Sequence, residues 1–110
     1  MTNKTRERII PSSGNVFADM GLPDAVELDT KVRLGAAICR IVERRKLTQI
    51  EVAAALGINQ PKVSALLHYK LEGFSVERLM RFLTALGHDV EIVIRPRPRA
   101  RSARLAVRAA

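Results

Sequence analysis

The stretch from Thr48 to Leu67, TQIEVAAALGINQPKVSALL, constrains the fold of this chain more than any other part. Its apolar residues recur at helical spacing on both sides of a Gly-Ile-Asn break, which predicts two short helices joined by a sharp turn. Gln49, Ala53, Gly57 and Val63 stand at relative positions one, five, nine and fifteen. At this spacing a small residue lets the helices cross closely, a glycine supplies a left-handed turn, and a valine points back into the joint.

The same stretch carries start signals for both helices. Thr48 is a natural N-cap, and Glu51 three residues later completes a capping box. Asn59 can cap the second helix, and Pro61 falls in its first turn, where a missing N–H costs nothing. We therefore expect helices over about 48–56 and 60–67, arranged as a helix-turn-helix that reads DNA.

The distribution of positive charge agrees with a DNA-binding module. The net charge is +8, and residues 31–74 hold eight basic and three acidic groups. Residues 95–110 add six arginines and no acid. A phosphate-binding surface would have this footprint, although a merely solvated basic face would have it too.

Composition excludes several other classes of protein. The 110 residues suffice for one domain with a modest core and tails. No apolar run approaches the roughly 20 residues that span a bilayer, and the start lacks the features of a signal peptide, so we expect a cytoplasmic protein that joins the nucleoid when bound to DNA. Cys39 is the only cysteine, which fits a reducing compartment and a small buried hydrophobe. Nothing in the sequence indicates a metal site, a cofactor or an enzyme.

The rest of the chain is predicted to form an arm, a helical bundle, a strand and a tail. Residues 1–27 are punctuated by proline and glycine and read as an amino-terminal arm. The arm holds an apolar cluster, which either packs on its own core or binds a partner: Val16, Phe17, Met20 and Leu22. The DNA-binding domain is predicted over 28–88. Its first helix is expected to start with Asp29 or Thr30 as the cap, and its last helix to run from Ser75 to Gly87.

Residues 89–95, DVEIVIR, alternate with period two and predict a single strand. A lone strand needs a partner, so we expect it to pair with the same strand of a second subunit through Val90, Ile92 and Ile94. The tail at 96–110 is expected to be flexible and rich in arginine, and three roles are open: an arm on nucleic acid, a solvated tail, or a segment ordered by a protein partner.

The outward residues of the helix predicted over 60–67 are expected to contact DNA. Gln60 has the amide geometry to take N6 and N7 of adenine, Lys62 can reach guanine or a phosphate, and Ser64 either a base or a phosphate. Gln49 and Thr48 are expected on phosphate, and Arg45 on the flanking backbone. The full predicted set is Thr48, Gln49, Asn59, Gln60, Lys62, Ser64, His68 and Lys70. For His68, ordinary surface is an equal alternative.

These residues resemble a known family. TQIEVAAALGINQPKVSALL is similar to the Xre/Cro-type helix-turn-helix shared with lambda repressor. SSGNVFADMGLPDA, FSVERLMRFLTALGHDVEIVI and the arginine tail resemble, more narrowly, short bacterial HigA-type antitoxins encoded beside a RelE/HigB-like toxin. The chain departs from that group at His68, where arginine is common, and in the loop that follows. The resemblance implies a mostly α, lambda-repressor-like bundle with one carboxy-terminal strand pairing across a dimer.

The resemblance also implies a function. It is that of a homodimeric repressor of a palindromic operator, with neutralisation of a toxin as a second role. The rival hypothesis is a protein-interaction module that mainly masks a toxin or enzyme, with the arm as its binding segment. A third is non-specific DNA binding through the tail.

Overall fold

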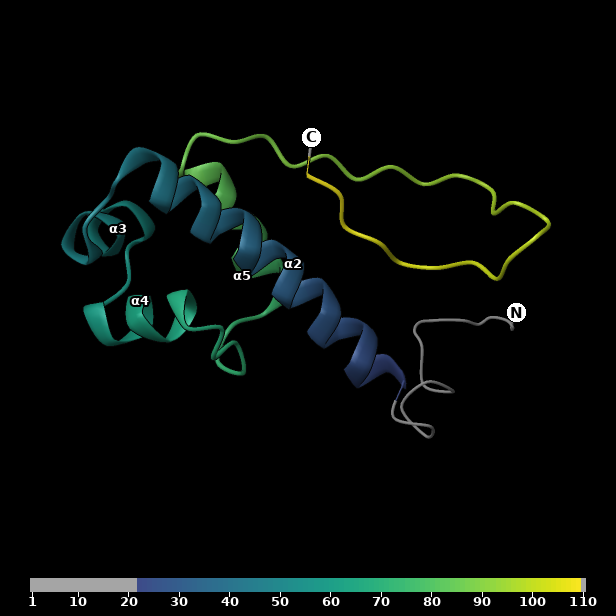
Figure 1. Cartoon of the computed structure of the whole chain (residues 1–110), viewed down its shortest axis with the longest axis horizontal. Helices are drawn as coiled ribbons and strands as arrows, with labels where there is room; N and C mark the ends of the chain where they lie inside the picture. Colours follow the sequence, from purple (N-terminus) through teal and green to yellow (C-terminus); the bar gives the residue numbers. More distant parts are fainter. Residues whose placement is uncertain (1–21, 110) are drawn as a thin grey trace.

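Four helices, ordered α2, α3, α4 and α5, make up the folded part of the chain (Figure 1). The computed structural model describes residues 22–109, with side chains described from residue 25. The helices span Leu22–Arg45 (α2), Gln49–Leu56 (α3), Gln60–Leu67 (α4) and Val76–Ala85 (α5). The prediction of a mostly α, helix-turn-helix bundle is confirmed.

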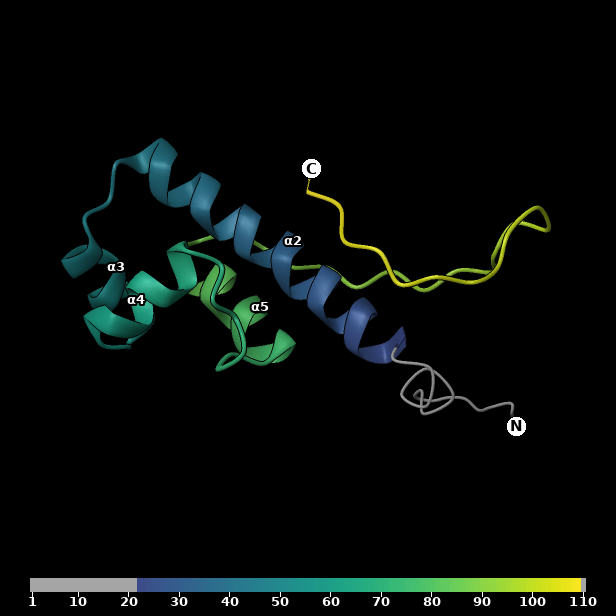
Figure 2. The same ribbon diagram turned by 60° about the horizontal axis from the view of Figure 1, so that its bottom comes forward.

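The long helix α2 packs chiefly against α5, while α3 and α4 pack on each other and close the bundle at one end. The buried hydrophobic residues come from every helix and from the α4–α5 loop: Leu34, Ile38, Ile41, Val42, Val52, Val63, Leu66, Leu71, Phe74, Leu79, Phe82, Leu83 and Leu86. The amino-terminal half of α2 projects beyond the other three helices, as both ribbon views show (Figures 1 and 2). The core is therefore confined to the end of the molecule that holds the helix-turn-helix.

The start of α2 corrects the sequence analysis. The helix already begins at Leu22, so the last residues of the expected arm are helical. Thr30 is not a cap but a buried residue inside the helix, where its hydroxyl donates to the carbonyl of Val26 at 2.9 Å. Asp29 instead accepts from Arg33 one turn later, at 3.0 Å, in an ion pair of the kind that supports an exposed helix. Most of the expected arm, including Val16, Phe17 and Met20, lies outside the described residues.

The segment after α5 is extended. Residues 88–98 have no helix or strand assignment, and the chain then turns at Pro98–Arg101 and runs back along the first limb (Figure 1). Val90 and Val107 lie one on each limb and pack against the core. No backbone hydrogen bond joins the two limbs, and the described part of the chain contains no strand. The predicted strand and its pairing with a second subunit stay predictions.

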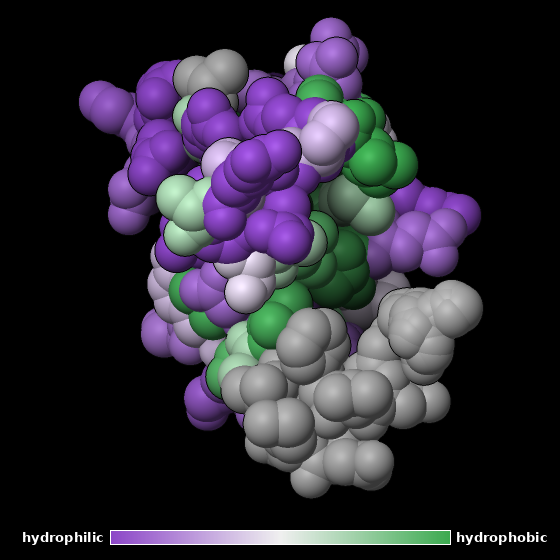
Figure 3. Space-filling model, turned by 90° about the vertical axis from the view of Figure 1, so that its right-hand side faces the viewer, coloured by the Kyte–Doolittle hydropathy of each residue, from purple (hydrophilic) through white to green (hydrophobic). Residues whose placement is uncertain are grey.

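The molecule exposes large hydrophobic side chains on α2 and on this extended segment: Leu28, Val32, Ile92, Val93, Ile94 and Leu105. Seen from the end where α2 projects, hydrophobic residues gather on one part of the described surface, beside a hydrophilic part (Figure 3). The exposed fractions of Ile92 and Ile94 are 73% and 93%. Ile92, Val93 and Ile94 are consecutive exposed apolar residues, and they leave an apolar surface available to a partner.

Candidate nucleic-acid interface

The start of α3 is held by reciprocal hydrogen bonds between Thr48 and Glu51. The Glu51 N–H donates to Thr48 Oγ1 at 3.1 Å, and the Thr48 N–H donates to Glu51 Oε1 at 2.8 Å. This is the predicted capping box. It fixes the first turn of α3, including Gln49, at the surface. The Thr48 hydroxyl keeps its own proton, so it can still donate to an outside oxygen.

The turn between α3 and α4 has the predicted geometry. Gly57 ends α3 with φ of 70° and ψ of 34°, the left-handed conformation that an L side chain adopts only with strain. Asn59 then caps α4 by accepting the Lys62 N–H on Oδ1 at 2.9 Å. Because the cap uses only the amide oxygen, the Asn59 NH2 group is left to donate outward.

Helix α4 is divided between a buried and an exposed face. Val63 and Leu66 are fully buried, while Gln60 and Lys62 are exposed in the first turns. Ser64, His68 and Lys70 are brought together as part of the lining of one shallow surface hollow, together with Pro61 and Ala65. Ser64, His68 and Lys70 therefore share one surface of the molecule, and Gln60 and Lys62 are exposed at the start of the same helix.

His68 lies at the carboxyl end of α4 with its ring turned back on the helix. Its Nδ1 lies 2.8 Å from the carbonyl oxygen of Ser64. A carbonyl oxygen only accepts, so Nδ1 carries the proton that makes this bond. The Nε2 atom is then an acceptor on the neutral ring and a donor on the charged one. His68 can accept a hydrogen bond from a base amino group or, when charged, bind an anion.

A cluster of aromatic rings lies beside the first turn of α4. The Lys62 Nζ lies 5.6 Å from the centre of the Phe74 ring, and Phe74 meets Phe82 edge to face at 5.8 Å. Arg78, which the sequence analysis did not single out, has its guanidinium 5.4 Å from the same Phe74 ring. In the sequence, Arg78 looks like an ordinary exposed arginine of a helix. Only the structure shows that it lies beside Phe74.

The comparisons with known proteins agree with this geometry. A family model described as a helix-turn-helix domain matches residues 16–95. A solved structure named as an XRE family transcriptional regulator is 62% identical, with a TM-score of 0.77, and covers 80% of this chain and 100% of its own. No curated protein sequence matches the chain.

The chain belongs to the XRE family of helix-turn-helix transcriptional regulators. In this XRE regulator, α3 and α4 form the helix-turn-helix and α4 holds the position of the recognition helix. The first turn of a recognition helix is the part that meets base edges. Gln60 and Lys62 occupy that part of α4.

Arg45 of this XRE regulator has a structural partner. Its Nη1 donates to the carbonyl oxygen of Leu86, the C-cap of α5, at 2.6 Å. A cation at the carboxyl end of a helix satisfies an orphan carbonyl and complements the helix dipole. Arg45 thus joins the end of α2 to the end of α5, an interaction that the sequence analysis, which assigned Arg45 to the DNA backbone, did not foresee.

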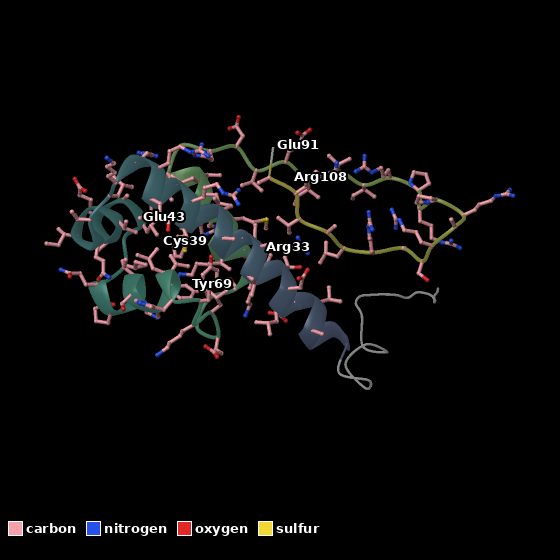
Figure 4. The ribbon with its side chains drawn as sticks, in the orientation of Figure 1. Arg33, Cys39, Glu43, Tyr69, Glu91 and Arg108 are labelled. Atoms are coloured by element: carbon pink, nitrogen blue, oxygen red, sulfur yellow. The ribbon has the colours of Figure 1, made fainter. Side chains whose placement is uncertain are left out.

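Cys39 lies half-buried on α2, with Tyr69 and Glu43 close by (Figure 4). Burial raises the pKa of the Cys39 thiol, a hydrogen bond with Tyr69 lowers it, and the Glu43 carboxylate raises it, with a net rise above the ordinary 9.0. Burial and the neighbouring Cys39 likewise raise the pKa of Tyr69. Cys39 is therefore a neutral thiol at physiological pH, which is the form that suits a packing role.

Alkaline pH is expected to destabilise the fold through Cys39. Because the folded-state pKa is raised, the unfolded chain loses this proton first, and the stabilisation that is complete below about pH 9 disappears as the pH passes the folded-state value. Thermal midpoints of Cys39→Ser should therefore fall less steeply than wild type between about pH 8.5 and 10.5. Parallel curves for the two proteins would contradict the assignment.

None of the helices in the described residues is both long and apolar enough to cross a bilayer. Within the same residues, no group of three His, Cys, Asp or Glu side chains is placed to hold a metal ion.

Proposed function

We propose that this XRE regulator is a sequence-specific repressor that reads a palindromic operator through α4 of two protomers. The observation that carries the proposal is the two-sided character of α4. Its inner face, Val63 and Leu66, is fully buried, and its first turn presents Gln60 and Lys62 to solvent. An α-helix with this division can enter the major groove without disturbing the bundle that carries it.

Each exposed group has a defined task in this proposal. Gln60 takes N6 and N7 of an adenine through its amide, which is the main source of sequence preference. Ser64 and His68 lie together further along α4, where the Ser64 hydroxyl and the free Nε2 of His68 contact bases or phosphates. Thr48 and Asn59 keep free donors after capping their helices, and both donate to phosphate oxygens.

The remaining predicted contacts flank this surface. Gln49 is exposed at the first position of α3, where its amide reaches a phosphate and braces Gln60. Lys70 lines the hollow beside His68 and supplies a positive charge to the backbone at the other end of α4. These contacts set the register of α4 in the groove, while the bases are read by the groups between them.

Specific binding by so short a recognition helix requires a homodimer. One helix of eight residues spans too few base pairs for useful specificity, and two such helices must stand about one turn of DNA (roughly 34 Å) apart. Residues 89–95 supply the pairing segment, since their backbone groups have no partner in the other limb and Ile92 and Ile94 are exposed. The two segments form an antiparallel ribbon across the two-fold axis.

A second role as the antitoxin of a toxin-antitoxin pair is favoured by the narrower sequence resemblance. A RelE/HigB-like toxin is the proposed partner, bound through the apolar cluster of the amino-terminal arm. The alternative is that masking such a partner is the main role and DNA binding is secondary. The reading frame beside the gene, and co-purification of its product with this protein, separate these two cases.

Gln60→Ala tests the reading of DNA by α4. Wild-type protein first selects its preferred duplex from a randomised pool, which should return an inverted repeat. The substitution is expected to cost about 1–3 kcal/mol per protomer on that duplex and to relax the preference at one base position in each half-site. The measurement is a fluorescence anisotropy titration of the selected duplex and of its single-base variants.

Thr84→Ala, on the exposed surface of α5, is the control for Gln60→Ala and should bind like wild type. An equal loss on every duplex would show that Gln60 does not read a base. Selection of no preferred duplex by the wild type would point to non-specific binding through the arginine tail. In the structure, Arg97 and Arg101 of that tail donate hydrogen bonds to carbonyl oxygens of the tail's own turn, and DNA would compete with these bonds.

A further inference from the structure

Two positively charged side chains from different helices meet at one aromatic ring. The Lys62 Nζ of α4 and the Arg78 guanidinium of α5 lie 5.6 and 5.4 Å from the centre of the Phe74 ring. Arg78 also lies 5.6 Å from the centre of the Phe82 ring. Both rings are buried, with 3% and 4% of their surface exposed, so they form a fixed base for the two cations. Contacts of this kind restrict where the charged groups can go.

The cation–π contacts are favourable, but two other terms oppose this arrangement. Lys62 and Arg78 each occupy the third position of their helix, since Asn59 and Ser75 accept their backbone N–H groups at 2.9 and 3.1 Å. A cation in the first turn opposes the helix dipole, and two cations at one ring repel each other. The ion pairs within the described residues involve other basic groups, Lys31, Arg33 and Arg81. An anion from outside the chain would relieve both unfavourable terms.

We propose that Lys62 and Arg78 together bind the phosphate backbone of DNA beside α4, as a two-cation clamp seated on Phe74. This inference rests on the proposed function and adds α5 to the DNA-binding surface. It also decides between the two roles that the sequence left open for Lys62, because a side chain held over Phe74 is directed towards α5 and its arginine. Lys62 contacts phosphate, and sequence reading falls to its neighbours on α4.

The guanidinium of Arg78 suits this task better than a mobile lysine would. Its planar group is placed by two rings, so less conformational freedom is lost when a phosphate binds. Its N–H groups can donate two parallel hydrogen bonds to phosphate oxygens. The competing explanation is that Arg78 only covers the edge of Phe74 and Phe82. In that case its aliphatic stem matters and its charge does not.

Arg78→Met and Lys62→Met separate these explanations, because methionine keeps an unbranched stem and removes the charge. Binding is measured between 50 and 200 mM KCl on the duplex selected by the wild type and on a scrambled duplex. Each substitution is expected to lower the salt dependence, the slope of log K against log salt, by about one unit per protomer. The affinity should fall by the same factor on both duplexes, and Arg78→Lys should restore part of the slope.

Arg81→Met is the matched control, since Arg81 lies on the same helix, is 76% exposed and pairs with Glu77 at 2.8 Å. Its slope should change much less than that of Arg78→Met. The clamp is overturned if Arg78→Met and Arg81→Met behave alike, or if Lys62→Met relaxes one base position while Arg78→Met leaves binding unchanged. If the wild type shows no sequence preference, the proposed repressor function fails, but the Arg78 and Arg81 slopes on any duplex still decide the clamp.

Discussion

Leu66→Ala is expected to lower the free energy of unfolding by about 2–5 kcal/mol. Leu66 lies on the inner face of the recognition helix and none of its surface is exposed, so truncation removes apolar contacts and leaves a cavity. Small domains have a total stability of roughly 5–15 kcal/mol, so much of the fold's stability would be lost. Denaturant unfolding followed by circular dichroism measures the change.

Leu28→Ala is the control for Leu66→Ala, because Leu28 is 56% exposed on the projecting half of α2. Its effect should stay within about 0.5 kcal/mol, as for most surface substitutions. DNA binding by Leu66→Ala should weaken only in proportion to its unfolded fraction. Similar losses of stability at the two positions would mean that α4 is not seated on the core in solution as it is in the structure.

Ile92→Pro is expected to weaken the proposed homodimer strongly. Proline removes the N–H that a ribbon between two protomers needs, and the two-fold axis makes the loss occur twice. Two lost hydrogen bonds of about 1–1.5 kcal/mol each correspond to a roughly 30- to 150-fold weaker dimer. Multi-angle light scattering over a dilution series reports the mass directly, and operator affinity should fall in parallel because half-sites are then bound one at a time.

Ile92→Thr is the matched control for the proline variant. Threonine keeps the backbone donor and the branched side chain that favours an extended segment, so this variant should still dimerise. Both proteins should retain the helical content of the wild type, since Ile92 is 73% exposed in the protomer. A proline variant that stays dimeric would rule out the ribbon and direct attention to the exposed leucine and valine of α2.

The helix-turn-helix could be predicted from the sequence because its determinants are local. The Thr48–Glu51 box, the left-handed Gly57 and the Asn59 cap each depend on residues within a few positions of one another, and all three appear in the structure as expected. Local chemistry of this kind is insensitive to the rest of the fold. The buried face of α4 followed from apolar spacing for the same reason.

The start of α2 was mispredicted because Pro23 was treated as punctuation. The helix begins at Leu22, which places Pro23 in the first turn, where proline is tolerated for the reason already given for Pro61. Thr30 and Asp29 look like caps in the sequence, yet an interior threonine can satisfy its hydroxyl by donating to a carbonyl four residues back. Capping residues mark a helix start only where no helical signal precedes them.

The contacts around the site that joined distant residues could not be predicted. Arg45 and Leu86 are separated by 41 positions, and Lys62 and Arg78 meet only because Phe74 lies between their helices. Apolar periodicity says which face of a helix is buried but not which helix lies against it. Similarly, the return of the tail that brings Val107 to the core has no signal in an arginine-rich sequence.

The four helices end in the same kind of backbone turn. Each of the four is followed by a left-handed residue, two of them glycines (Gly57 and Gly87) and two not: Lys46 with φ of 54° and Tyr69 with φ of 61°. An L side chain in this conformation costs roughly 1–2 kcal/mol, which glycine would avoid. The fold therefore tolerates strain at two positions, one with a charge beside the joint to α3 and the other with a phenol beside Cys39. Glycine at either position would stabilise this small regulator, and it would also remove that charge or that phenol.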